Sequence, residues 1–280
     1  RFGVLGPQRS ARTLRRHRRI TSIHCGSASC SRLASAAAPF GVQLCLINAA
    51  GATRRRSNTN GGAAMARTRG FDRPLTTNQV ASWIGNALAT AWFYGVVAWV
   101  LLRDRRHCNE RVVAILVIPH VLCVLVGLCS WLFMETHPPT KTSCFGSLLG
   151  DTPRWTKKRY CREHKASIEG LDHFCTWLNV SVGRQNYVPF YLLSAAGTVQ
   201  YALHTAICVF IIISCKRPMQ LGALVVIGAC GLMGFGILLA YAALFGFHTY
   251  LAFLGIGTYD WIIDQRKAPQ TTEMTGRVGD

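Results

Sequence analysis

Four long stretches of this chain contain no charged residue, and they limit the folds that it can adopt. They are Ala81–Leu102, Val112–Met134, Val188–Ser214 and Leu221–Phe247. The shortest has 22 residues and would be about 33 Å long as an α-helix, enough to cross a hydrocarbon core of roughly 30 Å. A soluble domain rarely contains even one such stretch. The sequence therefore predicts an all-α integral membrane protein with four transmembrane helices.

These helices divide the chain into six parts. We expect a basic leader over residues 1–64, an N-terminal segment over 65–80, two transmembrane helices within 81–134, a polar domain over 135–187, two more transmembrane helices within 188–247 and a C-terminal segment over 248–280. Weak hydrophobic periodicity and many Gly, Ser, Thr and Pro residues predict that the polar domain consists of loops with short extended pieces. An even number of spans places both termini and the polar domain on the same side of the membrane.

The net charge of +19 would indicate a nucleic-acid ligand if it were spread along the chain. The first 64 residues, however, contain eleven Arg and no acidic residue, so most of the charge is N-terminal and we expect no nucleic-acid partner. The leader is typical of an organelle transit peptide, or is a gene-model extension upstream of Met65. Eight Lys and Arg in the polar domain favour the cytoplasm for it, whereas four in the first short loop favour the opposite orientation.

The polar domain contains the segment LDHFCTWLN, in which Asp172, His173 and Cys175 are close in sequence. In an extended stretch, residues two apart share a face. A neighbouring imidazole makes the thiolate more available, and a carboxylate can fix the tautomer of the ring. The three residues are therefore a candidate nucleophile, base and orienting acid, although such a tetrapeptide alone is more typical of a loop or a partial metal site. A disulfide framework is the weaker interpretation of the twelve cysteines, because four of them lie in the apolar stretches.

The residues around this segment extend the pattern. The sequence DHFCTWLNVSVGRQNY, followed by Phe190 and an apolar stretch, resembles the DHHC-type protein S-acyltransferases, or palmitoyltransferases. The matching motif positions are Asp172, His173, Cys175, Trp177, Val182, Gly183, Asn186 and Phe190. The order of two helices, the motif and two more helices also matches, so the resemblance covers roughly Ala81–Trp261.

The resemblance implies a protein-cysteine S-palmitoyltransferase that moves palmitate from palmitoyl-CoA to cysteine thiols of substrate proteins. Cys175 would carry the acyl-enzyme, with His173 as base and Asp172 as its partner. The protein would be in contact with membrane lipid in the Golgi, the endoplasmic reticulum or the plasma membrane, with both termini and the catalytic domain in the cytosol. The residues expected to bind the acyl chain or CoA are Trp177, Asn186, Lys157, Lys158 and Arg159.

The family's Thr-Thr-x-Glu motif has a partial match after the fourth helix. Thr258 and Asp260 match its second Thr and its Glu, and we expect both to support the site. Gly257 replaces the first Thr, which in the family helps to hold the catalytic Asp. We therefore expect Asp172 to be held less firmly.

Most of the family's zinc ligands are absent. Phe174 and Ser181 replace a His and a Cys ligand, and the same site keeps only Cys161 and His164, the latter in place of a Cys. The positions of the second site, none of which keeps a ligand, are near Ser147, Gly150, Tyr160 and Ser167. A structural zinc needs four N or S ligands, so zinc binding stays open. We expect the domain to be held by its two flanking helices, or by packing of Phe174.

Two other functions stay open. The missing ligands and Gly257 are also typical of a catalytically impaired relative that acts as a membrane scaffold. His120 and His204, inside apolar stretches, would suit the proton relay of a small transporter. The sequon at Asn179 would allow glycosylation only if the polar domain were lumenal. The presence of Asp172, His173 and Cys175 together favours the active acyltransferase.

Overall fold

The computed structural model of the chain describes residues 66–103, 110–214 and 220–275. Its four long helices are α3 (Thr77–Arg103), α4 (Glu110–Thr136), α7 (Tyr187–Ser214) and α8 (Leu221–Leu254). Each contains one of the charge-free stretches and is long and apolar enough to cross a membrane. The prediction of an all-α membrane protein with four spans is confirmed. The leader over residues 1–64 lies outside the described residues.

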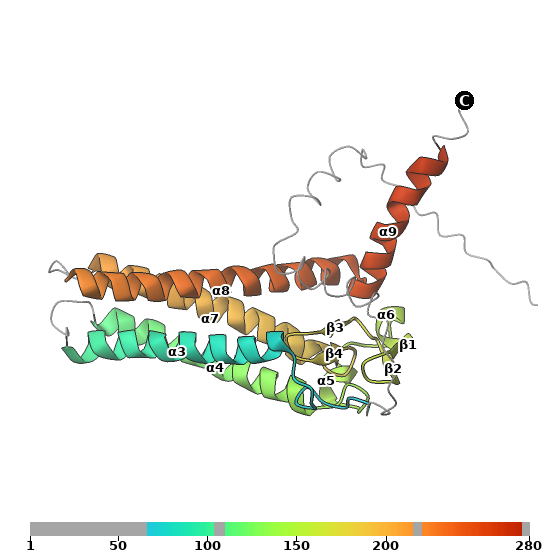
Figure 1. The fold of residues 1–280 in the computed structure, drawn as a ribbon, viewed down its shortest axis with the longest axis horizontal. Helices are drawn as coiled ribbons and strands as arrows, with labels where there is room; N and C mark the ends of the chain where they lie inside the picture. Colours follow the sequence, from blue (N-terminus) through green and yellow to red (C-terminus); the bar gives the residue numbers. More distant parts are fainter. Residues whose placement is uncertain (1–65, 104–109, 215–219, 276–280) are drawn as a thin grey trace, which may run out of the picture. The chain divides into compact units, whose positions relative to one another are not determined.

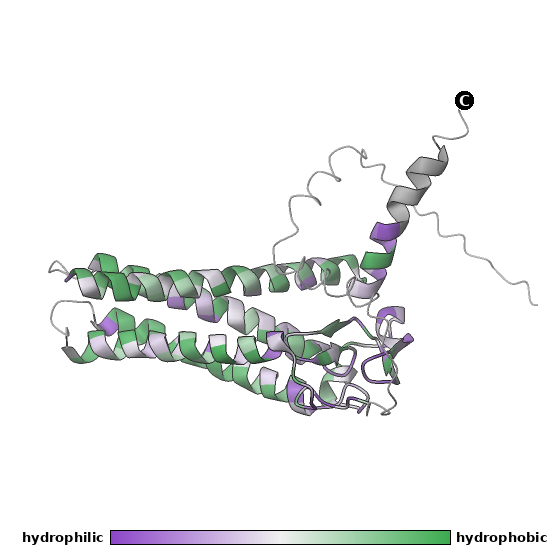
Figure 2. Cartoon of the chain, in the orientation of Figure 1, coloured by the Kyte–Doolittle hydropathy of each residue, from purple (hydrophilic) through white to green (hydrophobic). Residues whose placement is uncertain are grey.

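The four helices pack lengthwise against one another. Helix α7 packs against both α4 and α8, and α3 also contacts α4 and α8 (Figure 1). The buried core between them is formed by Phe93, Val96, Val97, Val100, Val113, Ile207, Cys208, Ile211, Ile227 and Cys230. Other apolar side chains point outward; Ile118 and Leu125 on α4, for example, are 61% and 51% exposed. Figure 2 shows this hydrophobic character along all four helices. Apolar surface of this extent suits lipid rather than water, so the chain is a multi-pass membrane protein.

The polar domain between α4 and α7 is built from short elements. They are α5 (Cys144–Ser147), α6 (Pro153–Thr156), β1 (Lys158–Cys161), β2 (Ala166–Glu169), β3 (His173–Cys175) and β4 (Val180–Val182). Strand β1 pairs antiparallel with β2, and β3 with β4, in two separate sheets. Loops with short extended pieces are what the composition predicted. At Gly170, before β3, φ is +59° and a Cβ would lie 2.8 Å from the carbonyl oxygen of Trp155, so the turn requires glycine.

The residues before α3 hold the polar domain against the helices. The side-chain amide of Asn179 donates to the carbonyl oxygen of Gly70 at 3.3 Å. The hydroxyl of Thr76 donates to the carbonyl oxygen of Thr176 at 2.6 Å, one position after Cys175. These contacts add a third anchor to the two flanking helices. They also bury Asn179, which is 1% exposed and is not accessible to glycosylation in this fold.

A buried carboxylate joins α3 to α4 at the end next to the polar domain. Glu135 accepts hydrogen bonds from the side chains of Gln79 at 3.0 Å, Trp83 at 2.9 Å and Trp131 at 2.7 Å. Its carbonyl oxygen accepts from the backbone N–H of Gly70 at 3.0 Å. One residue therefore fixes two membrane helices and the segment before α3.

Helix α8 ends close to the polar domain and is followed at once by another helix. Gly255 caps α8 in the left-handed conformation, with φ of +67°, which glycine adopts without strain. Three residues after this cap, α9 (Thr258–Thr275) begins. Its first residue contacts the loop before β3, so the chain returns after its fourth span to the domain between the second and third.

Candidate active site

Strand β3 has two faces with different neighbours. His173 and Cys175 lie on one face and Phe174 on the other, because side chains alternate along a strand. In the pairing with β4, His173 lies opposite Val182 and Cys175 opposite Val180. The cysteine and the histidine are thus held at fixed positions by a hairpin that begins directly after Asp172.

The carboxylate of Asp172 is buried and fully engaged. Its Oδ1 accepts from the backbone N–H of Thr258 at 3.0 Å, and its Oδ2 accepts from the hydroxyl of Thr258 at 2.6 Å and from Nδ1 of His173 at 3.0 Å. The guanidinium of Arg154 lies 3.7 Å from Oδ1. Burial raises the pKa of Asp172, but the hydrogen bond and charge of His173, with the bond from Thr258, bring this pKa well below its ordinary value. Asp172 is therefore ionised and orients the ring of His173.

His173 connects this carboxylate to Cys175. Burial lowers the pKa of His173, but hydrogen bonds with Asp172 and Cys175, and the charges of both, raise it to about 9. Since Asp172 occupies Nδ1, the other ring nitrogen, Nε2, is the one available to Cys175. The ring is protonated at neutral pH, and an imidazolium in this position can hold a cysteine thiolate as an ion pair.

Residues of the membrane helices complete the surroundings of His173. The ring centroid of His248 on α8 lies 5.4 Å from that of His173, and Phe190 on α7 lies 5.2 Å from it. The hydroxyl of Tyr187 lies 3.4 Å from Nδ1 of His248 and accepts a hydrogen bond from Arg154 at 3.1 Å. The sequence did not identify Arg154, Tyr187 or His248 as site residues. Two of them had a sequence signal: Tyr187 ends the segment DHFCTWLNVSVGRQNY, and His248 lies in the stretch before the partial Thr-Thr-x-Glu motif.

The first residue of α9 supports Asp172. The expectation that Gly257 would leave Asp172 loosely held is wrong, because Thr258 supplies both a backbone and a side-chain donor. A Cβ on Gly257 would lie 3.0 Å from Oδ1 of Asp172, closer than ordinary contacts. Glycine at this position therefore allows the start of α9 to approach the carboxylate.

Asp260 is connected to the site only indirectly, through Arg159. It forms an ion pair with Arg159, whose guanidinium also donates to the carbonyl oxygen of Leu171 at 3.2 Å and lies 4.6 Å from the ring centroid of Tyr259. This pair ties α9 to the loop that precedes β3. The predicted contact of Arg159 with CoA stays a prediction, and in the structure Arg159 pairs within the protein.

The opposite face of β3 meets the positions at which the resemblance places zinc ligands. Phe174 lies opposite Ser181 in the hairpin, and its ring centroid is 6.3 Å from that of His164. The Sγ of Cys161 and the hydroxyl of Ser181 share a hydrogen bond of 3.1 Å. Nε2 of His164 accepts from the backbone N–H of Ser181 at 3.2 Å, and its Nδ1 donates to the carbonyl oxygen of Arg67 at 2.8 Å.

This cluster fits a site without metal. Backbone groups occupy both ring nitrogens of His164, and burial lowers the pKa of this histidine, which keeps it neutral. Phe174 and Ser181 offer no ligand of the kind that structural zinc uses. In the part of the chain that the structure describes, Cys161 and His164 do not belong to a group of three residues that could hold a metal ion. Zinc at these two residues stays a prediction; in the structure, hydrogen bonds of Cys161 and His164 with Ser181 join the two hairpins.

The remaining residues that the sequence singled out differ in exposure. Trp177 is 37% exposed in the turn between β3 and β4, and Lys157 and Lys158 are exposed at the start of β1. Asn186 is fully buried; its Oδ1 accepts from the backbone N–H of Gly183, and its amide donates to the carbonyl oxygen of Ser181. Asn186 therefore supports the loop after β4, whereas contacts of the other three with acyl-CoA stay predictions.

The structure has four helices able to span a membrane, next to a polar domain in which Asp172, His173 and Cys175 are in contact. Comparison with known proteins finds two similarities. Residues 151–265 match the family model described as DHHC palmitoyltransferase. The chain is also 27% identical over 124 residues to "Probable protein S-acyltransferase 20" of Arabidopsis thaliana. That match covers 39% of this chain and 18% of the plant protein.

Proposed function

We propose that the chain is an active protein S-acyltransferase, which takes a palmitoyl group from palmitoyl-CoA and transfers it to cysteine thiols of proteins at the membrane. The observation that carries the proposal is the continuous set of contacts from Thr258 through Asp172 and His173 to Cys175. It lies within the residues that match the DHHC family. The donor, the acceptor and the acyl-enzyme are part of the proposal.

The first step forms the acyl-enzyme. The thiolate of Cys175 attacks the thioester carbonyl of palmitoyl-CoA, a C–S bond to Cys175 forms and the C–S bond to CoA breaks. The imidazolium of His173 gives its proton to the departing CoA thiolate, so that CoA leaves as the thiol. Asp172 keeps the ring in position and stabilises its charge until the proton has moved.

The second step reverses these roles. Once Cys175 is acylated, its charge no longer raises the pKa of His173, so the neutral ring becomes a better base. His173 takes the proton of a substrate thiol, whose sulfur attacks the acyl group and releases Cys175 as a thiolate. The imidazolium–thiolate pair is restored, and one thioester has replaced another, so neither step is steeply uphill.

The surroundings of Cys175 suit a lipid chain joined to a charged carrier. Cys175 is 6% exposed and packs with apolar side chains that include Met134 of α4 and Phe190 of α7. A palmitoyl chain that enters the membrane helices near Trp177 would gain about 0.8 kcal/mol for each buried CH₂. Exposed Lys157 and Lys158 would meet the phosphates of CoA, and a cytosolic domain in an endomembrane or the plasma membrane would have access to this donor.

Labelling with an alkyne analogue of palmitoyl-CoA tests the proposal. The purified protein in detergent should take up label that hydroxylamine removes, and Cys175→Ser should lose it. Cys144→Ser changes an exposed thiol of the same domain and should keep the label. Equal label in wild type and Cys175→Ser would contradict the proposal. Release of label by a cysteine-containing peptide would then test the second step.

The hydrogen-bonded cluster at Phe174 and Ser181 favours a second candidate, a DHHC-type scaffold without activity, because the metal ligands are absent. This candidate predicts no thioester on Cys175 and an unchanged cellular phenotype in the Cys175→Ser variant. The intact contacts around Asp172 favour the enzyme over the scaffold. A transporter, the third hypothesis, has no support from the family match.

A further inference from the structure

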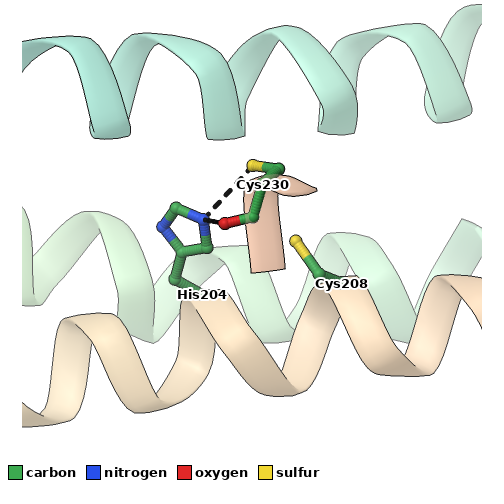
Figure 3. A group of neighbouring side chains, drawn as sticks. All are labelled: His204, Cys208 and Cys230. Atoms are coloured by element: carbon green, nitrogen blue, oxygen red, sulfur yellow. Dashed lines mark hydrogen bonds between the residues drawn. The ribbon is translucent and has the colours of Figure 1, made fainter. Parts of the chain in front are cut away.

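A second group of reactive side chains lies inside the membrane helices, apart from the acyltransferase site. His204 and Cys208 are one turn apart on the same face of α7, and Cys230 faces them from α8. All three are buried, with exposed fractions of 0%, 1% and 0%. Figure 3 shows their side chains pointing toward one another. The proposed acyl transfer uses none of them.

The distances between these side chains are close to those of a metal site. One ligand atom from each residue lies within 4.8 Å of the other two, and Nε2 of His204 is 3.3 Å from Sγ of Cys230. Around a tetrahedral zinc ion, with Zn–S bonds of about 2.3 Å and Zn–N bonds of about 2.0 Å, ligand atoms lie roughly 3.5–3.8 Å apart. Small rotations of the side chains would therefore bring the three donors into coordination distance.

The backbone of α8 leaves room for this group. A Cβ on Gly231 would lie 3.1 Å from Cβ of Cys208, and a Cβ on Gly234 would lie 2.7 Å from the imidazole carbon Cδ2 of His204. Larger residues at these two positions would push the side chains of α7 away from Cys230. The two glycines thus allow the thiol and the imidazole to meet the second thiol.

Without an ion, the buried ring of His204 has too few hydrogen bonds to replace those it would make in water. Its Nε2–H donates to the carbonyl oxygen of Cys230 at 3.1 Å, an oxygen of a helix backbone, while its Nδ1 has no hydrogen-bond partner in the described part of the chain. A polar group in an apolar helix bundle is costly when it is not fully paired. A coordination bond to Nε2 would be much stronger than the bond that this nitrogen now makes.

We propose that His204, Cys208 and Cys230 bind one zinc ion between α7 and α8. Zn²⁺ displaces the protons of the two thiols, which leave as two H⁺, and binds two thiolates and a neutral imidazole. The resulting group carries no net charge, which favours it inside hydrocarbon, whereas Cu⁺ with the same ligands would leave one negative charge buried. Three protein ligands are enough to hold zinc with its fourth position open.

The zinc site would join α7 and α8, the two membrane helices whose side chains contact His173. Phe190 lies on α7 and His248 on α8, and both contact the ring of His173. The zinc site does not depend on acyl transfer, because the ion would be present whether or not Cys175 reacts. A scaffold without activity would bind it equally well.

Metal analysis of the full-length protein, purified in detergent without added chelator, tests the proposal. We expect wild type to hold one zinc ion per chain at this site, and Cys208→Ser and Cys230→Ser to lose it to less than about a tenth of that occupancy. Cys123→Ser, which changes a thiol of α4 outside the group, should keep it. Cys161→Ser separates this ion from any zinc in the polar domain and should also keep it.

A second measurement uses wild type alone, so its result does not depend on whether the variants fold. Wild type reconstituted with Co²⁺ should show the intense thiolate-to-metal absorption of a cysteine site, and added Zn²⁺ should remove it. The proposal is overturned if wild type lacks zinc, if it holds copper instead, or if Cys208→Ser and Cys230→Ser keep as much zinc as Cys123→Ser. Absence of the Co²⁺ absorption would also overturn it.

Discussion

The hydroxyl group of Thr258 donates a 2.6 Å hydrogen bond to Oδ2 of Asp172, 86 positions earlier in the chain. The same oxygen accepts from Nδ1 of His173, so the start of α9 and the hairpin share one acceptor atom. The segment after the fourth membrane helix therefore takes part in orienting the histidine beside Cys175.

Replacing Thr258 with Val should slow acyl-enzyme formation. The change removes a hydrogen bond to a buried charge, worth about 1.5–3 kcal/mol, which corresponds to roughly a tenfold to hundredfold loss in rate. Single-turnover release of CoA measures this rate. Thr258→Ser keeps the hydroxyl and should restore most of it, and a Val variant as fast as wild type would show that the contact has no part in positioning Asp172.

The rate of the first step should depend on the protonation of His173. Because the pKa of His173 in the folded protein is raised to about 9, the imidazolium that protonates CoA is present below that pH and is lost as the pH rises through it. In Asp172→Asn the hydrogen bond from His173 weakens and the negative charge is gone, so the decline should begin at lower pH. A profile of CoA release against pH detects the shift.

Asp151→Asn is the matched control for this profile. Asp151 is an exposed carboxylate that pairs with Arg184 and has no contact with His173. Its substitution should leave the decline near pH 9. An unshifted profile in Asp172→Asn would show that Asp172 does not raise the pKa of His173.

The cluster on the other face of β3 should be convertible into a zinc site. Phe174→His together with Ser181→Cys would place four N or S ligands around a point that Cys161 and His164 already approach. His164 would have to release the backbone N–H of Ser181, a small loss beside the free energy of about 10–16 kcal/mol that zinc contributes in small domains. We expect the double variant to bind one more zinc per chain than wild type and to melt at a higher temperature.

Ser181→Cys alone is the control for the converted site. It supplies only three ligands and should bind the additional ion less tightly than the double variant. If neither variant gains zinc, the four positions do not converge as the structure describes.

Glu135→Leu should destabilise the junction of α3 and α4. The substitution removes the acceptor of the buried Gln79 amide and of the partly buried indole N–H groups of Trp83 and Trp131, at a cost of up to about 1–3 kcal/mol for each group left unsatisfied. The melting temperature in detergent should fall clearly, and Glu135→Gln, which keeps one acceptor oxygen, should lose less. Equal melting temperatures for Glu135→Leu and wild type would mean that these bonds do not contribute to stability.

The sequence was sufficient for the parts of the protein whose signal is local. A stretch without charges, such as Val188–Ser214, predicts its own helix because a bilayer admits few other structures. His173 and Cys175 are two residues apart directly after Asp172, so their position on one face of an extended strand could be foreseen from the spacing.

The rest depends on contacts between distant elements. Arg154 of α6 lies near Asp172 and His248 of α8 near His173, while Tyr187 of α7 contacts Arg154 and His248, and no short pattern connects these three residues. The support of Asp172 was misjudged because the role of Gly257 depends on a 3.0 Å approach that only the fold reveals. The bonds of His164 to Arg67 and Ser181 were not foreseeable either, since they depend on how the hairpins meet the segment before α3.

Strand β3 points Phe174 toward the cluster that holds the domain together and Cys175 toward the reacting face. Support of the domain and the proposed reaction thus involve adjacent residues on opposite sides of one backbone. A protein engineer could exchange the means of support, from hydrogen bonds to a metal, without touching the side chains proposed to react. For the same reason, loss of metal ligands on one side is no measure of chemical competence on the other.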